Sequence, residues 1–162
     1  MLPHVRGAVS GDIEAIKALA IVNGMFGPDE VETFDALFAG FLDGSLGRHR
    51  WAVAGEPGHR IEGAAYFAPE PFSDRVWNLF FIAVRPDVHR SGTGTALLAH
   101  VEQELRSIGE SVARVLIVET SSTDAYLSAR QFYGARGFDL EATIREFYGP
   151  GDDKVVFWKS LL

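Results

Sequence analysis

The sequence predicts an α/β fold, with a mixed, mostly antiparallel sheet of six to seven strands and helices on both faces. Two pairs of strand-like segments are each joined by a short turn, and this arrangement predicts antiparallel hairpins. Between them the chain passes from strand to helix to strand around residues 93–107, and such a crossover joins parallel strands. No repeat, low-complexity tract or polar linker interrupts the chain, so we expect one domain over residues 1–162.

The first half of the chain predicts a strand, two helices and a hairpin. Residues 4–9 read as the strand, and Ser10 or Asp12 can cap the first helix, which Pro28 ends. The second helix is expected over about residues 29–43. Apolar residues recur at helical spacing in both helices: Ile13, Ile16, Leu19 and Ala20, then Val31, Phe34, Leu37, Phe38 and Phe41. The segments RHRWAVAG and HRIEGAAYFAP follow as two strands around the turn EPGH.

The second half predicts four strands and two helices. The strand at residues 75–84 is apolar almost throughout, which suggests that both of its faces are covered, and Pro86 stops it. A helix at about residues 93–107 ends at Gly109, the strand ARVLIVET follows, and a helix at about 124–136 ends at Gly137. The inward side of the first of these helices carries Leu97, Leu98, Val101 and Leu105. The strands DLEATIREFY and KVVFWKSL close the chain around the turn GPGDD.

Composition narrows the classes of function. No apolar run approaches the roughly 20 residues of a membrane span, and the N-terminus lacks the basic and apolar blocks of a signal peptide. The absence of cysteine excludes disulfides, thiolate metal sites and a cysteine nucleophile, and fits a cytoplasmic protein. A net charge of -7 argues against nucleic-acid binding. That charge either attracts a cationic substrate or simply keeps the protein dissolved.

A glycine-containing turn at residues 89–94 is the most informative stretch of the sequence. It follows a buried strand and opens a helix, whose first backbone N–H groups lack partners and attract anions. Gly92 and Gly94 remove the side chains that would keep a phosphate away, and Arg90 can add a charged contact. Hydroxyls come from Ser91, Thr93 and Thr95. The turn therefore predicts a site for a pyrophosphate or a similar dianion.

Other interpretations of this turn are weaker. It lacks the Gly-Lys-Ser/Thr of a P-loop, which argues against hydrolysis of ATP or GTP. A dinucleotide fold is disfavoured because antiparallel hairpins do not make a doubly wound sheet. A glycine loop without a ligand is the remaining alternative, and the strand, Pro86, Arg90 and the amphipathic helix speak against it.

Two motifs resemble those of the GCN5-related N-acetyltransferase (GNAT) family. Residues 84–98 contain V-R-P-x-x-x-R-S-G-T-G-T-A-L-L, which is similar to the family's acyl-CoA signature. Residues 129–138 match its A-x-x-[LF]-Y-x-x-x-G-F pattern, and the strand and helix order fits along the whole chain. The chain departs from the family at His89, where Gln or Arg is usual, and at Tyr126, where Asn is common. The resemblance implies acetyl-CoA as the acyl donor, and the lack of metal-ligand spacing among His, Asp and Glu predicts no metal.

The resemblance also implies roles for individual residues. Backbone N–H groups near Ala83 and Val84 would meet the pantetheine arm and the thioester. The further coenzyme contacts that it implies are His89, Arg90, Ser91, Gly92, Thr93, Gly94, Thr95, Tyr126 and Arg130. Tyr133 is the candidate acid for the leaving thiolate; otherwise it is a core tyrosine.

The base that takes the amine's proton is harder to assign. Glu119 lies at the C-terminal side of a central strand, where sites in such sheets gather, although a strand-end carboxylate is often merely solvated. Glu62 is a weaker candidate. His49, His59 and His100 are scattered and read as exposed or structural, and no acidic or histidine grouping has metal-ligand spacing.

Substrate recognition is expected in residues 24–48 and in the hairpin at 143–155. These contain Phe26, Phe34, Phe38, Phe41, Phe147, Tyr148, Asp152 and Asp153. Phenylalanines at helical spacing usually belong to a core, and aspartates are common in turns for backbone reasons. The leading hypothesis is transfer of an acetyl group to a primary amine of a small molecule or peptide; an acyl-CoA sensor without turnover and a dinucleotide-dependent oxidoreductase are the alternatives. A homodimer stays open.

Overall fold

The computed structural model describes residues 3–56 and 59–162, apart from the side chain of Val31. Its strands are β1 (Val5–Gly7), β2 (Arg50–Ala54), β3 (Gly63–Pro69), β4 (Val76–Val84), β5 (Val115–Ser121), β6 (Asp139–Gly149) and β7 (Asp152–Ser160). Its α-helices are α1 (Ile13–Val22), α2 (Thr33–Asp43), α3 (Thr93–Ile108) and α4 (Leu127–Ala135). Short 3-10 turns are η1 (Ser10–Asp12), η2 (Glu30–Glu32), η3 (Pro86–Val88) and η4 (Asp124–Tyr126).

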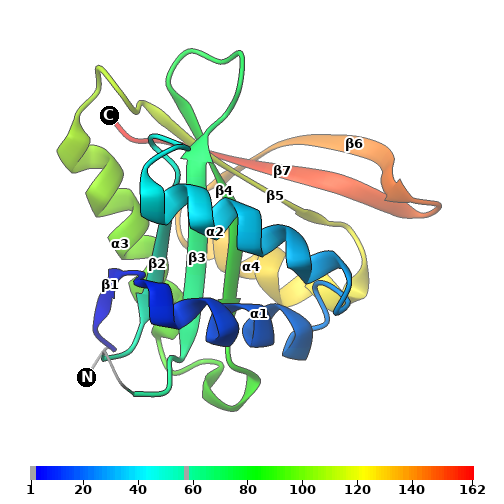
Figure 1. Ribbon diagram of the computed structural model, residues 1–162. Coiled ribbons are helices and arrows are strands. Elements are labelled where there is room, and N and C mark those ends of the chain that lie inside the picture. The colour runs from blue at the N-terminus through cyan, green and yellow to red at the C-terminus, as the bar shows by residue number, and fades with distance from the viewer. Residues whose placement is uncertain (1–2, 57–58) are drawn as a thin grey trace. The chain divides into compact units, whose positions relative to one another are not determined.

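The strands form a seven-stranded sheet in the order β1-β2-β3-β4-β5-β7-β6 (Figure 1). The pairs β1–β2, β2–β3, β5–β7 and β6–β7 are antiparallel. The pair β4–β5 is parallel, because the chain returns through α3 between these two strands. The predicted fold class, a mixed and mostly antiparallel sheet with helices, is therefore confirmed.

By its internal contacts the chain divides into two compact units. The first consists of Met1–Ala68 and Phe81–Glu104, and the second of Pro69–Phe80 and Leu105–Leu162. The single domain expected over residues 1–162 stays a prediction.

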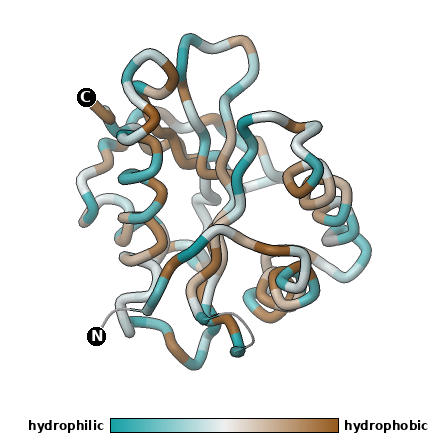
Figure 2. The backbone as a smooth tube through the Cα atoms, turned by 60° about the vertical axis from the view of Figure 1, so that its left-hand side comes forward, coloured by the Kyte–Doolittle hydropathy of each residue, from teal (hydrophilic) through white to brown (hydrophobic). Residues whose placement is uncertain are grey.

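The first unit is layered. Its strands lie between α1 and α2 on one side and α3 on the other, as the two views in Figure 1 and Figure 2 agree. On the α3 side of these strands, the α3 residues Leu97, Leu98 and Val101 are buried, as their spacing predicts. The hydrophobic colouring in Figure 2 runs along the strands between these helices.

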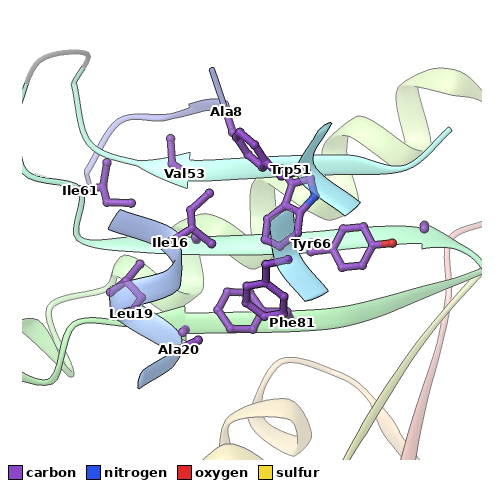
Figure 3. Close-up of a cluster of buried hydrophobic side chains, with 14 residues drawn as sticks. Ala8, Ile16, Leu19, Ala20, Trp51, Val53, Ile61, Tyr66 and Phe81 are labelled. Atoms are coloured by element: carbon purple, nitrogen blue, oxygen red, sulfur yellow. The ribbon is translucent and has the colours of Figure 1, made fainter. Parts of the chain in front are cut away.

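An aromatic cluster fills the layer beneath α1 and α2 (Figure 3). Trp51 of β2 stacks on Tyr66 of β3 with ring centroids 4.6 Å apart. Phe34 and Phe38 of α2 meet the same indole edge-on, at 5.5 and 5.7 Å. Burying each such side chain contributes roughly 1.5–3 kcal/mol, so α2 is held chiefly by this cluster. Phe34 and Phe38 are thus core residues of the described structure.

The second unit has an aromatic core of its own. The Tyr133 ring of α4 packs against Phe138 at 5.7 Å and against Phe157 of β7 at 5.6 Å. Gly137, which ends this helical region, has a φ of 89°, the left-handed conformation that its sequence position predicts.

Details of the predicted elements change in the structure. Phe80 of β4 is 47% exposed, so the strand is not covered along its whole length. Tyr126 ends the 3-10 turn η4 rather than lying inside a helix that begins near residue 124. The predicted turn EPGH lies partly outside the described residues, as does the Val31 side chain.

Gly63 lets β3 approach the start of α3 closely. A Cβ at this position would lie 2.8 Å from Leu97 Cδ1, 2.9 Å from the Ala83 carbonyl oxygen and 3.2 Å from Thr93 Cγ2. The backbone oxygen is the hardest of these neighbours to move, so no side chain fits without displacing β4 or α3.

We expect Gly63→Ala to destabilise the protein by about 1–3 kcal/mol through overpacking, measured as the free energy of unfolding in urea. Gly134→Ala is the matched control: a Cβ at this α4 glycine would meet nothing within 4 Å. The control should be neutral or stabilising by up to about 1 kcal/mol. Equal stability of the two variants would contradict the close-approach argument.

Candidate functional site

The turn between β4 and α3 in the first unit has the form that binds anions. After η3 the backbone passes through Arg90 with φ 67° and Gly92 with φ 92°, both left-handed. The Gly92 carbonyl then accepts the hydrogen bond of Ala96 N at 2.9 Å, which is the first turn of α3. The N–H groups of that first turn have no partner within the helix and carry the positive end of its dipole. The predicted strand–turn–helix order is therefore present, but Gly94 lies within α3 without a positive φ, and Arg90 is the second left-handed residue of the turn.

The side chains of the turn are tied to the protein. Ser91 Oγ donates to the Val88 carbonyl at 2.5 Å and lies 2.9 Å from Thr93 Oγ1. Thr93 is 1% exposed, and its hydroxyl donates to Glu62 Oε2 at 3.1 Å. Because these hydroxyl protons are engaged inside the turn, backbone N–H groups are the better phosphate donors. Glu62 thus supports the turn, which its sequence context did not reveal.

His89 closes the turn onto the strand end. Its Nε2 lies 2.8 Å from the Val84 carbonyl oxygen and donates to it, since a carbonyl only accepts. Arg85 adds a bidentate pair with Asp87, at 2.7 and 3.1 Å. Arg90 is exposed and lies before Thr93, the first residue of α3. Contacts of Ala83 and Val84 with a pantetheine arm stay predictions, as do those of Gly94 and Thr95.

Glu119 lies near the end of β5 in the second unit and has two polar partners. Asn78 Nδ2 donates to its Oε1 at 2.9 Å, and Lys154 Nζ lies 2.5 Å from its Oε2. Asn78 is 2% exposed and also donates to Glu70 Oε2 at 3.0 Å, so it bridges two carboxylates. Asn78 Oδ1 has no hydrogen-bond partner among the described residues. This arrangement fixes the direction of the Glu119 carboxylate.

Tyr133 is a buried residue, 5% exposed, within its aromatic cluster. Burial raises the pKa of its phenol well above the ordinary value, because the charged form is poorly solvated there. Such a phenol is a hydrogen-bond donor rather than a strong acid. A thiolate, whose conjugate acid has a pKa of about 8.5, needs no more than that.

Tyr126 and Arg130 are the other coenzyme contacts expected in this unit. Arg130 Nη1 donates to the carbonyls of Ser121 and Thr123 at 2.7 and 2.8 Å, which ties the strand end to the helix. Tyr126 is half-buried at the end of η4. Both assignments as coenzyme contacts stay predictions.

The three histidines singled out from the sequence are dispersed. His49 Nδ1 lies 2.5 Å from the Tyr66 hydroxyl, and burial lowers the pKa of His49 and raises the pKa of Tyr66 to about 12. His100 lies 3.5 Å from Glu104 on α3, and His59 is exposed. In the described ranges, 3–56 and 59–162, no group of three His, Asp or Glu side chains is arranged to hold a metal ion.

Sequence reasoning missed Asn78 and Lys154. A signal existed for Asn78, since it is the single amide in an otherwise apolar strand, VWNLFFIAV. For Lys154 there was none, because a lysine at a strand start is ordinarily solvated.

None of the described helices is both long and apolar enough to span a bilayer.

Comparison with known proteins gives concordant matches. The model of the Acetyltransferase (GNAT) family matches residues 19–138. The [ribosomal protein bS18]-alanine N-acetyltransferase of Escherichia coli (strain K12) is 43% identical over 75 residues, 46% of this chain and 47% of its own length. The chain therefore spans about half the length of the curated relatives it matches.

Two solved structures cover nearly the whole chain. A GNAT-family protein of Desulfovibrio desulfuricans has a TM-score of 0.88 and 30% identity, and the alignment covers 98% of this chain and 99% of that one. The yncA protein of Salmonella typhimurium, solved with its cofactor acetyl-CoA, has a TM-score of 0.77 and 20% identity, with 98% and 94% covered. At that lower identity the second match concerns the fold alone.

The raised pKa of Tyr133 predicts a loss of stability in base. An unfolded tyrosine ionises near a pKa of about 10, whereas the buried phenol keeps its proton, so its stabilising contribution is complete below about pH 10 and is lost as pH rises further. We expect the free energy of unfolding to fall more steeply between about pH 9 and pH 11 in the wild type than in Tyr133→Phe. Parallel curves for the two proteins would contradict this.

Proposed function

Because this chain belongs to the Acetyltransferase (GNAT) family, we propose that it transfers an acetyl group from acetyl-CoA directly to a primary amine. The observation that carries the proposal is the turn between β4 and α3, where a strand leads through two left-handed residues into a helix start. That geometry suits the pyrophosphate of coenzyme A. The acceptor is a small molecule or a peptide.

The turn binds the coenzyme through its backbone on this proposal. The first-turn N–H groups of α3 donate to the phosphate oxygens, and the helix dipole adds its positive end. Arg90 supplies a charged contact from the exposed side of the turn. Main-chain N–H groups and a single arginine would together let a chain of net charge -7 bind a polyanion without a cluster of basic side chains at this turn.

Transfer needs three events at the reacting atoms. The neutral amine attacks the thioester carbonyl, the C–S bond breaks, and coenzyme A leaves as its thiol or thiolate. We assign Glu119 as the base that accepts the amine's proton and Tyr133 as the donor to the departing sulfur. Asn78 supports the first assignment, because its amide fixes the orientation of the Glu119 carboxylate.

The names of similar proteins suggest which amine acceptors to test first. The E. coli protein named above acts, by its name, on an alanine of ribosomal protein bS18, so a peptide with an N-terminal alanine belongs in the first acceptor panel. Polyamines and amino acids complete that panel. A cytoplasmic location, a homodimer, a single domain and the lack of a nucleic-acid partner stay predictions.

The coenzyme site is tested by adding a negative charge at the start of α3. We expect Gly94→Glu to weaken binding of coenzyme A at least tenfold in isothermal titration calorimetry, because the carboxylate repels phosphate at the helix start. Ala39→Glu, on the exposed side of α2, adds the same charge to the same unit and should bind like the wild type. Equal weakening in both would point to net charge, and no weakening in either would refute the site.

Turnover is tested by release of free thiol from acetyl-CoA with the acceptor panel. We expect Glu119→Gln to lower kcat by about 10²–10⁴-fold and Tyr133→Phe by about 10²-fold, with little change in coenzyme binding. Glu110→Gln removes an exposed carboxylate of the same unit and should keep full activity. Coenzyme binding without thiol release for any amine would instead favour the sensor function.

A further inference from the structure

The ammonium group of Lys154 fills a site that is built for a cation. Its Nζ lies 2.5 Å from Glu119 Oε2, 3.5 Å from the centroid of the Phe147 ring and 6.0 Å from that of Tyr148. The two rings stand at 88° to each other with centroids 5.2 Å apart, so they form a corner. We call Glu119, Phe147 and Tyr148 the ammonium cage. A carboxylate and aromatic faces are the groups that stabilise an alkylammonium ion.

Strand register brings the two charges of the cage together. In the antiparallel pair β5–β7, Lys154 lies opposite Ser121, and Glu119 lies opposite Val156. Glu119 and Ser121 are two residues apart, so they share one face of β5, and Lys154 is the diagonal neighbour of Glu119 on that face. Their contact is a consequence of sheet geometry.

A bulge in β6 supplies the aromatic corner. The pairing with β7 shifts between Ile144, which lies opposite Lys154, and Gly149, which lies opposite Asp152. Glu146 within this bulge has a φ of 52°, and its N–H donates to Asp153 Oδ1 at 2.8 Å. Left-handed backbone at a glutamate costs free energy, and bulges of this kind often redirect side chains next to a functional site.

The surroundings of the cage favour positive charge. Asp152, whose Oδ1 accepts from Ser121 Oγ at 2.5 Å, is a second carboxylate close by. Burial and then the charges of Glu119 and Asp152 raise the pKa of Tyr148 to about 12. Phe147 and Tyr148 are 54% and 46% exposed, so the aromatic walls are open to solvent while the Lys154 side chain is only 13% exposed. A cation from solution can therefore reach the cage.

We propose that the ammonium cage binds the ammonium group of an alkylamine acceptor and that Lys154 is its built-in competitor. The inference rests on the proposed function in one respect: it places the acceptor's nitrogen at Glu119, the assigned base. An incoming alkylammonium displaces the Lys154 ammonium, and only then can Glu119 take its proton. Apparent affinity is lowered by the fraction of molecules in which Lys154 fills the cage. Neutral molecules of the same shape gain nothing there, so the cage selects for charge.

The test measures binding of n-butylammonium chloride, followed by chemical-shift changes in nuclear magnetic resonance spectra at constant ionic strength and without coenzyme. We expect Lys154→Met to bind butylammonium at least tenfold more tightly than the wild type, with shifts centred on residues 145–154. The control is Lys159→Met on the same strand, whose Nζ lies over the Phe138 ring at 5.3 Å and which should leave affinity unchanged. 1-Butanol, which has the same chain without the charge, should not bind.

Several outcomes would overturn the proposal. The first is that Lys154→Met binds butylammonium no more tightly than the wild type, and the second is that Lys159→Met gains as much affinity as Lys154→Met. The others are that 1-butanol binds as tightly as butylammonium, or that the chemical-shift changes lie outside residues 145–154. If Lys154→Met does not fold, Lys154→Gln takes its place, and Glu119→Gln in the wild-type background should abolish butylammonium binding. The assay contains no acetyl-CoA, so its failure alongside normal thiol release would refute the cage and leave the enzyme. Tight binding of butylammonium to Lys154→Met without thiol release for any amine would support the cage and refute the proposed enzymatic function.

Discussion

The constraint on which the first unit depends is that α3 begins directly after a strand and a tight turn. A helix start leaves N–H groups that no residue of the same helix can satisfy. The structure fixes that start from three sides: Gly63 lets β3 approach it, the Thr93 hydroxyl bonds Glu62, and Gly92 takes the left-handed backbone. On the proposed function, the main-chain N–H groups at this start bind the anion, so a chain of net charge -7 needs no locally positive surface there.

The second unit meets a different constraint, which is the cost of removing charge from water. Glu119 and Lys154 have side chains 24% and 13% exposed, and such groups must be paired or hydrogen-bonded. Asn78, the one amide of an apolar strand, supplies the second bond to the carboxylate. The pairing that makes these charges tolerable also means that the proposed base is shared with a lysine. Access to Glu119 then becomes a competition between cations, which is a source of selectivity.

Local patterns were sufficient for most of the fold. Helical spacing placed Ile16, Phe38 and Leu97 in the interior, and all three are buried. Turn chemistry located the end of the α4 region, where Gly137 has positive φ. These predictions succeed because the spacing of apolar residues along a helix and the backbone conformation at a turn both depend on residues close together in the chain. They fail at element ends such as Tyr126, where a 3-10 turn competes with the helix at small cost.

The sequence by itself determined the fold class, the glycine turn that opens α3 and the family, because each is encoded in a contiguous run of residues. Only the tertiary structure decided that Lys154 sits on Glu119, that Asn78 bridges two carboxylates and that the Phe147 ring covers an ammonium group. A strand's alternation tells which face a side chain occupies, but not which residue of a distant strand lies beside it. That partner is set by strand register and by a bulge of a few residues, and neither has a local signature as strong as a helical repeat.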